Sequence, residues 1–206
     1  MRIVALSDLH GYLPPDVPAA DLVLIAGDVC PDAAGPGDQA FWLRYQFAPW
    51  AERLKARAKV MCWGNHDFVG QMHPHLWAPL PLEVVTDRTA SVLGLTIYAT
   101  PWTCTVPGVW AFDVEPKQLA VHLERIPDGL DILMTHGPPF GVLDRVVSGH
   151  RVGSTALAAA VARVRPRLHV FGHIHEARGQ EGSSYNVAIV DERYEPYQLP
   201  LTVIDF

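Results

Sequence analysis

Short apolar runs recur along the chain, and each ends in a glycine or in a cluster of polar residues. Six of these runs predict strands that are buried on both faces: Ile3–Leu6, Leu22–Ala26, Val60–Trp63, Leu95–Ala99, Ile132–Met134 and Leu168–Phe171. Shorter strand patterns lie at Val84–Val85, Tyr185–Val190 and Leu201–Ile204. Continuous apolar runs of this kind are typical of the strands in α/β layers.

Helical patterns alternate with these runs. Three segments are predicted helices: Gln39–Lys59, Glu115–Leu123 and Thr155–Val164. Pro49 either interrupts the first helix or lies in a first turn, and Pro116 is acceptable in the first turn of the second. Ser154 is placed to cap the third, which should stop at Arg165-Pro166.

Two segments are predicted to be irregular. Pro31–Asp38 is a loop by its proline, glycine and aspartate content, and Pro101–Asp113 is an aromatic, proline-broken loop or excursion over a site. The chain has 206 residues and contains no internal repeat, linker or low-complexity tract. The alternation of strands and helices therefore predicts one α/β domain over residues 1–206.

Five of the predicted strands lead into residues that commonly bind metal ions. These residues are Asp8 and His10, Asp28, Asn65 with His66 and Asp67, His136, and His173 with His175. The carboxyl ends of parallel strands meet at one edge of a sheet, where ligands usually bind. Any one of these residues alone is more often a helix cap, a turn residue or a core histidine. The repetition of the pattern at five strand ends indicates a shared site.

The donor set indicates two metal ions rather than one. Seven of these residues are candidate ligands: Asp8, His10, Asp28, Asn65, His136, His173 and His175. Three oxygen donors and four imidazoles exceed the needs of one tetrahedral ion, so two divalent ions sharing a bridging carboxylate are predicted. Mixed oxygen and imidazole ligands without thiolate favour manganese, with iron and zinc as alternatives, and disfavour a magnesium-only site.

Charge and cysteine content narrow the partners. The formal net charge is −6 and no long basic run occurs, which disfavours polymeric DNA or RNA as a partner. A small phosphoester remains compatible, because metal ions supply positive charge locally. Cys30, Cys62 and Cys104 are scattered, and the sequence has neither a signal-peptide pattern nor an apolar run long enough to span a membrane. We expect a cytoplasmic protein; the sequence does not indicate its oligomeric state.

The five blocks, in this order, resemble the signature of the calcineurin-like metallophosphoesterases. The resemblance implies a four-layer αββα sandwich in which two mixed β-sheets are flanked by helices. It also implies that Asp8, His10 and His175 hold one metal, that Asn65, His136 and His173 hold the other, and that Asp28 bridges them. A hydroxide between the metals would attack phosphorus, with Asn65 and His66 in contact with the substrate. His66 would protonate the leaving oxygen or steady the developing charge, and Asp67 would orient the ring of His66. The alternatives are that His66 is a further metal ligand or a turn residue, and that Asp67 caps the next helix.

Less universal segments are similar to the metallophosphoesterase-domain-containing proteins, which are class III-type cyclic nucleotide phosphodiesterases. The segments are Thr100-Pro101-Trp102-Thr103, Trp110-Ala111-Phe112, Thr135-His136-Gly137-Pro138-Pro139 and Arg167–Glu176. In that group the Pro-Trp segment lies near the site, so Trp102 is expected to stack on a base or phenyl ring. The alternative is that Trp102 and Trp110 are packing residues.

One departure from a related group bears on the substrate. Protein serine/threonine phosphatases follow Gly-Asp with an arginine that holds the phosphate, whereas Asp28 is followed here by Val29-Cys30-Pro31-Asp32. Without that arginine, a phosphodiesterase acting on small diesters, cyclic nucleotides among them, is the favoured prediction. A phosphomonoesterase acting on a nucleotide or phosphoprotein is the enzymatic alternative. A non-catalytic scaffold on the same fold is disfavoured because no ligand is missing.

Overall fold

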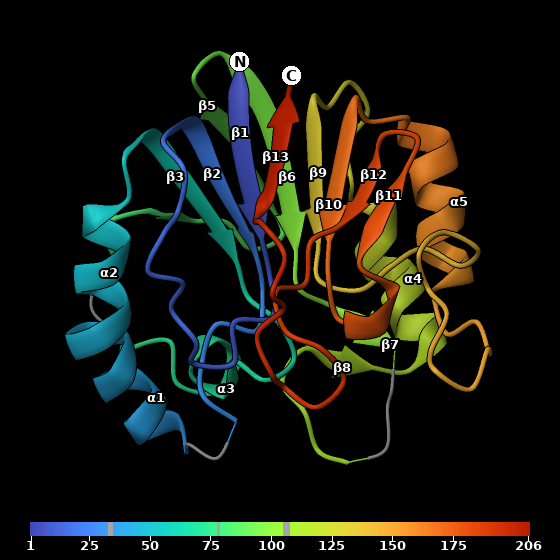
Figure 1. Cartoon of the computed structure of the whole chain (residues 1–206). Coiled ribbons are helices and arrows are strands. Elements are labelled where there is room, and N and C mark those ends of the chain that lie inside the picture. The colour runs from blue at the N-terminus through green and yellow to red at the C-terminus, as the bar shows by residue number, and fades with distance from the viewer. Residues whose placement is uncertain (33–34, 78, 105–107) are drawn as a thin grey trace.

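The strands of the computed structural model, which describes residues 1–32, 35–77, 79–104 and 108–206, form two large sheets that pack face to face (Figure 1). Within these residues, the first sheet has the order β13 (Thr202–Asp205), β1 (Arg2–Leu6), β2 (Ala20–Ala26), β3 (Ala56–Cys62) and β4 (Glu83–Val84). The second has the order β11 (Gly179–Glu181), β12 (Ser184–Asn186), β10 (Leu168–Phe171), β9 (Ile132–Thr135), β6 (Leu95–Thr100) and β5 (Arg88–Val92). A separate pair joins β7 (Thr103–Cys104) to β8 (Asp113–Val114).

Both large sheets are mixed. The inner strands β1, β2 and β3 run parallel to one another, as do β6, β9, β10 and β12, while β13, β5 and β11 are antiparallel to their neighbours. Helices cover the outer faces of both sheets (Figure 1). The predicted sandwich of two mixed sheets flanked by helices is therefore confirmed.

The helices fall into two groups, one on each outer face. The continuous helical segment α1 (Pro36–Trp42), the π-helix η1 (Leu43–Phe47) and α2 (Ala48–Arg53) covers the first sheet. The helices α4 (Pro116–Glu124) and α5 (Thr155–Val164) cover the second. Shorter elements are α3 (Phe68–Met72) and the 3₁₀ turn η2 (His175–Ala177). Among the described residues no helix combines the length and apolar character needed to cross a bilayer.

Burial on both faces explains why the strand sequences are continuously apolar. Ile3 and Leu24 face the space between the sheets, where they belong to one core cluster with Ile132. The alternate residues of the same strands, such as Val4, belong to a second cluster beneath the first group of helices. Leu133 belongs to a third cluster with residues of α4 and α5. Because neither face of these strands reaches water, no polar alternation appears in their sequences.

The six strong apolar runs are strands as predicted, but several boundaries were wrong. The helix predicted for Gln39–Lys59 ends at Arg53, and Lys59 lies in β3 paired with Val23. The predicted loop Pro31–Asp38 contains the start of α1 at Pro36, because proline is well tolerated in a first helical turn. Of that loop, Ala33 and Ala34 lie outside the described residues.

Two further predictions need correction. The segment Tyr185–Val190 is a strand only as far as Asn186, beyond which Ala188 forms an isolated pairing with Ser7. The segment Pro101–Asp113 is not wholly irregular, because Thr103–Cys104 pairs with Asp113–Val114. Residues 105–107 of that segment lie outside the described residues.

Candidate metal centre

The carboxyl ends of β1, β2 and β3 in one sheet and of β9 and β10 in the other lie at the same end of the sandwich, the lower end in Figure 1. The turns that follow these strands carry the seven candidate ligands. Four of the seven have a left-handed backbone: Asp8 (φ 56), His10 (φ 42), Asp28 (φ 52) and His173 (φ 68). Such conformations cost of order 1–3 kcal/mol each for strained residues and cluster at functional sites. The backbone strain therefore coincides with the predicted ligands.

Two glycines allow these turns to approach one another closely. A Cβ at Gly172 would overlap the carboxylate of Asp8 and the hydroxyl of Ser7. A Cβ at Gly64 would overlap the carboxylate and backbone nitrogen of Asp28. Only glycine, which has no Cβ, leaves room at these two positions for the carboxylates of Asp28 and Asp8.

The first group of candidate ligands is Asp8, His10 and His175, whose donor atoms lie within 4.8 Å of one another. Nε2 of His175 is 3.3 Å from Oδ1 of Asp8 and 3.2 Å from Nε2 of His10. The fully buried carboxylate of Asp8 also accepts hydrogen bonds from the backbone N–H of His173, at 3.0 and 3.1 Å. Asp8 is thus fixed in place with its oxygens facing two imidazoles.

The second group is Asp28, His136 and His173, again with donor atoms within 4.8 Å of one another. Nε2 of His136 lies 3.1 Å from Oδ2 of Asp28 and 2.9 Å from Oδ1 of Asn65. The same oxygen of Asp28 is 3.8 Å from Nε2 of His10, which belongs to the first group. Asp28 therefore lies between the two groups, where a bridging ligand is expected.

The other ring nitrogen of two of these histidines is bonded to a backbone carbonyl. Nδ1 of His136 is 3.0 Å from the carbonyl oxygen of Ala26, and Nδ1 of His175 is 2.9 Å from that of Asp191. A carbonyl can only accept, so Nδ1 carries a proton and Nε2 is the ring nitrogen that faces the site. This arrangement is characteristic of metal-binding histidines, and the donor set therefore fits two divalent ions.

The electrostatics of the site favour cations. Burial alone would raise the pKa of Asp8, but the adjacent His175 and His136 outweigh it and lower that pKa to about 2. Burial alone would lower the pKa of His136, yet Asp28 and Asp8 raise it to about 9. The pKa of His175 is likewise raised to about 9, chiefly by Asp8 against the opposing effect of burial. Without metal, protons on these imidazoles balance the carboxylates, so metal binding should release protons.

His66 forms a third group with His10 and Asp28, whose donor atoms lie within 4.8 Å of one another, and it also contacts a carboxylate outside the seven candidate ligands. Its Nδ1 is 2.7 Å from Oδ1 of Asp32, and its backbone N–H donates to Oδ1 of Asp28 at 2.8 Å. Burial would lower the pKa of His66, but the contact with Asp32 and the charge of Asp28 raise it. Asp32 also contacts Nδ1 of His10, and the two imidazoles lower the pKa of Asp32 to about 2 against the effect of burial.

The prediction that Asp67 orients the ring of His66 was wrong. The buried carboxylate of Asp67 accepts three backbone N–H groups, from Gly64 at 2.8 Å, Cys30 at 2.9 Å and Val29 at 3.0 Å. These bonds join the turn after β3 to the turn after β2. Asp67 therefore positions the backbone of the site, and Asp32 contacts the His66 ring in its place.

A cavity of about 340 Å³ opens onto this centre and is bordered by Asp28, Asn65, His66 and His173. Sequence reasoning missed Tyr194, whose ring centroid lies 4.6 Å from that of His10. It also gave Trp110 only a packing role, although the ring centroids of Trp110 and His66 are 4.4 Å apart. Trp110 lies within an aromatic segment that the sequence shows, but the sequence around Tyr194 contains no motif.

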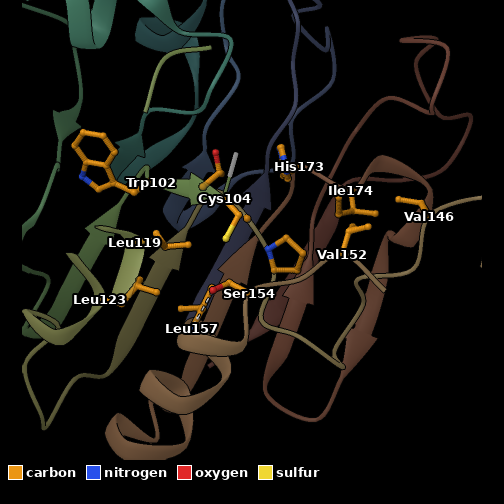
Figure 2. Close-up of a pocket in the computed structure, with 13 residues that line it drawn as sticks. Trp102, Cys104, Leu119, Leu123, Val146, Val152, Ser154, Leu157, His173 and Ile174 are labelled. Atoms are coloured by element: carbon orange, nitrogen blue, oxygen red, sulfur yellow. Dashed lines mark hydrogen bonds between the residues drawn. The ribbon is translucent and has the colours of Figure 1, made fainter. Parts of the chain in front are cut away.

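Trp102 borders a different, neighbouring cavity (Figure 2). Its indole N–H donates to Oδ2 of Asp87 at 2.6 Å, and its ring stacks on His122 with centroids 4.1 Å apart. The ring of Phe112 meets the indole of Trp102 edge-on, with ring centroids 5.5 Å apart. Because one face is already covered, this geometry favours the packing alternative over stacking on a substrate.

A sandwich of two mixed sheets, with carboxylates and imidazoles gathered at the ends of both, defines the class of two-metal phosphoester hydrolases. The chain belongs to the calcineurin-like phosphoesterase family, whose sequence profile it matches over residues 1–177. Members of this family depend on a pair of metal ions, and the chain is accordingly a metal-dependent phosphoesterase.

Individual relatives agree with this assignment. The chain is 31% identical to Metallophosphoesterase domain-containing protein 1 of Homo sapiens, over 98% of this chain and 70% of that protein. It is 28% identical to the cAMP/cGMP dual specificity phosphodiesterase MT0825 of Mycobacterium tuberculosis, over 75% of this chain and 48% of that protein. The crystal structure of TT1561 of Thermus thermophilus shares the fold, with a TM-score of 0.56 and 17% identity over 92% of this chain and 89% of that one.

Proposed function

We propose that the chain is a phosphodiesterase that hydrolyses small phosphodiesters, cyclic nucleotides among them, by attack of an activated water on phosphorus. The observation that carries this proposal is the position of Asp28 between two sets of ligands. Asp8, His10 and His175 would hold one ion, Asn65, His136 and His173 the other. When bound, two divalent ions activate water and neutralise the phosphoryl oxygens. Manganese is the favoured metal because oxygen and imidazole donors are mixed without thiolate.

His66 is the proposed general acid. It borders the cavity with Asp28, and the contact with Asp32 raises the pKa of His66, which favours the protonated ring. A departing alkoxide is a strong base and needs a proton as the bond to phosphorus breaks. Asp32 would hold the imidazole in position and stabilise its positive charge through the 2.7 Å contact.

The charges around the cavity support a diester over a monoester. The residues that border it include two glutamates, Glu176 and Glu192, and among those that the structure describes there is no lysine or arginine. Val29 and Cys30, which follow Asp28, are fully buried and offer no cation. A doubly charged monoester would be repelled more strongly by the glutamates than a singly charged diester. The similarity to the mycobacterial cyclic nucleotide phosphodiesterase supports the same choice.

A comparison of two chromogenic esters tests the proposal. The manganese-loaded protein should hydrolyse bis(p-nitrophenyl) phosphate with at least tenfold higher kcat/KM than p-nitrophenyl phosphate. A preference for the monoester would overturn the diester assignment and support a phosphomonoesterase. No turnover of either ester by fully metal-loaded protein would support a scaffold. Asp16→Asn, at an exposed position that does not border this cavity, is the matched control for Asp28→Asn.

We also infer a cytoplasmic location. Cys30 and Cys62 are buried free thiols, and Cys104 is free as well. Unpaired cysteines are typical of reducing compartments. Fractionation of the source cells tests this, and recovery of the protein in a secreted or membrane fraction would contradict it.

A further inference from the structure

An apolar cavity of about 350 Å³ lies directly beside the metal centre (Figure 2). Three residues border both this cavity and the one that opens onto the metal ligands: Val146, His173 and Ile174. Since His173 is itself a candidate ligand, a phosphate held at the centre would lie within one side chain of the apolar cavity. The volume is in the lower part of the range of small-molecule pockets, about 300–1,000 Å³.

Most of the side chains that line this cavity are hydrocarbon. Leu119 and Leu123 from α4 and Leu157 from α5 form one side, and Figure 2 shows Ile174 and Val152 across from them. The three leucine side chains border the cavity, yet they are only 2 to 4% exposed to solvent.

Few polar groups remain for a ligand in this cavity. The hydroxyl oxygen of Ser154 already accepts the backbone N–H of Leu157, at 3.1 Å, as the cap of α5. The hydroxyl of Thr103 has no hydrogen-bond partner within the described part of the chain, and the thiol of Cys104 is only a weak donor and acceptor. A nucleobase would leave several donors and acceptors unpaired here, which is costly, whereas an alkyl chain would leave none.

The wall formed by Val146 and Val152 is held in place by a buried carboxylate. Asp144, which is fully buried, accepts the backbone N–H groups of Gly141 at 2.9 Å and Gly153 at 3.2 Å, and pairs with Arg151 at 2.6 Å. These contacts fix the segment that carries Val146 and Val152. A wall ordered before binding reduces the conformational entropy that a ligand must overcome.

We propose that this cavity binds an unbranched alkyl arm of the phosphodiester whose phosphate lies at the metal centre. The inference rests on the proposed function and narrows its substrate to alkyl phosphodiesters. The three residues that border both cavities place the alkyl arm next to the phosphate, and the leucine wall supplies the selectivity. Nucleotides would then be turned over less efficiently than a diester with a hydrocarbon chain.

Binding of alkylphosphonates to the manganese-loaded full chain tests the cavity without requiring turnover. Isothermal calorimetry with methyl-, butyl- and hexylphosphonate should show affinity rising roughly two- to fourfold per methylene. Val152→Trp, at a rim position that is 47% exposed, should remove this dependence and leave methylphosphonate binding unchanged. Val121→Trp is the matched control, because Val121 lies on α4, is 53% exposed and is not part of the cavity wall.

Equal affinities for the three phosphonates, or a chain-length dependence that survives Val152→Trp, would overturn the proposal. A kinetic comparison separates this failure from that of the proposed function. If p-nitrophenyl methyl and hexyl phosphate are hydrolysed equally well, the phosphodiesterase stands and the alkyl site falls. If neither is hydrolysed while hexylphosphonate binds more tightly in a Val152-dependent manner, the alkyl site stands and the phosphodiesterase falls.

Discussion

The contact between Asp32 and His66 gives the sharpest prediction about catalysis. Oδ1 of Asp32 lies 2.7 Å from Nδ1 of His66 and also contacts Nδ1 of His10. Asp32→Asn keeps the size of the side chain and removes its charge. The positive charge of protonated His66 would then lose its nearest carboxylate outside the ligand set.

The expected loss in rate follows from the exposure of this pair. A hydrogen bond to a charged group contributes about 1.5–3 kcal/mol. The Asp32 side chain is 36% exposed, so screening by water places the contact at the lower end, about 1.5 kcal/mol. That energy corresponds to roughly a tenfold fall in kcat. Because Asp32 raises the pKa of His66, its removal should also move the alkaline limb of the kcat profile to lower pH.

The assay is hydrolysis of 3′,5′-cyclic AMP, whose leaving group is an alkoxide, under saturating manganese between pH 5.5 and 10, with metal content measured in parallel. Asp38→Asn, an exposed aspartate in the first turn of α1, serves as the control and should behave as the parent. In a His66→Gln background, Asp32→Asn should have almost no further effect, because the two residues act as a unit. A tenfold loss that persists in that background, or an unshifted alkaline limb, would refute the reasoning.

Three further predictions follow from the site and the core. Asp28→Ala should lose bound metal and activity together, whereas His66→Ala should keep its metal and lose about 10²–10⁴ in kcat, as metal analysis and kinetics would show. Asp67→Ala leaves three buried N–H groups without their acceptor and should lower the free energy of unfolding by about 3 kcal/mol in urea titrations. Burial lowers the pKa of His169 to about 3 in the folded protein. As the pH falls below about 6.5, the imidazole of His169 therefore takes up a proton in the unfolded chain but not yet in the folded one, and stability decreases. Between pH 7.5 and 5 the parent should lose about 2 kcal/mol more stability than His169→Gln, and equal losses would contradict that assignment.

The strands were predictable where both of their faces are buried. In β5 (Arg88–Val92) three of the five residues are exposed, so its sequence gives no continuous apolar run and the strand was missed. Ala56–Lys59 favours a helix by composition, yet it pairs with β2, and the Lys59 ammonium donates to the carbonyl of Ala51 at 2.6 Å. Pairing with a neighbouring strand outweighed local helix propensity in that segment, and no local pattern reports such a contact.

The convergence of the seven candidate ligands was predictable because each lies within four residues of the carboxyl end of a strand, and strand ends converge for geometric reasons. Asp32 was not recognised because it lies in a loop, where sequence spacing does not fix direction. The same limitation explains the error at Asp67. Its backbone (φ −88, ψ 65) belongs to a turn in which its carboxylate faces Val29 and Cys30 instead of the neighbouring imidazole.

The central claim is that Asp28 joins two metal sites, and anomalous diffraction from crystals of the manganese-loaded protein tests it most directly. The account predicts two anomalous peaks per chain, about 3.5–4 Å apart, with the carboxylate of Asp28 in contact with both ions. One peak would be surrounded by Asp8, His10 and His175, and the other by Asn65, His136 and His173. A single peak, or two peaks of which only one touches Asp28, would contradict the account.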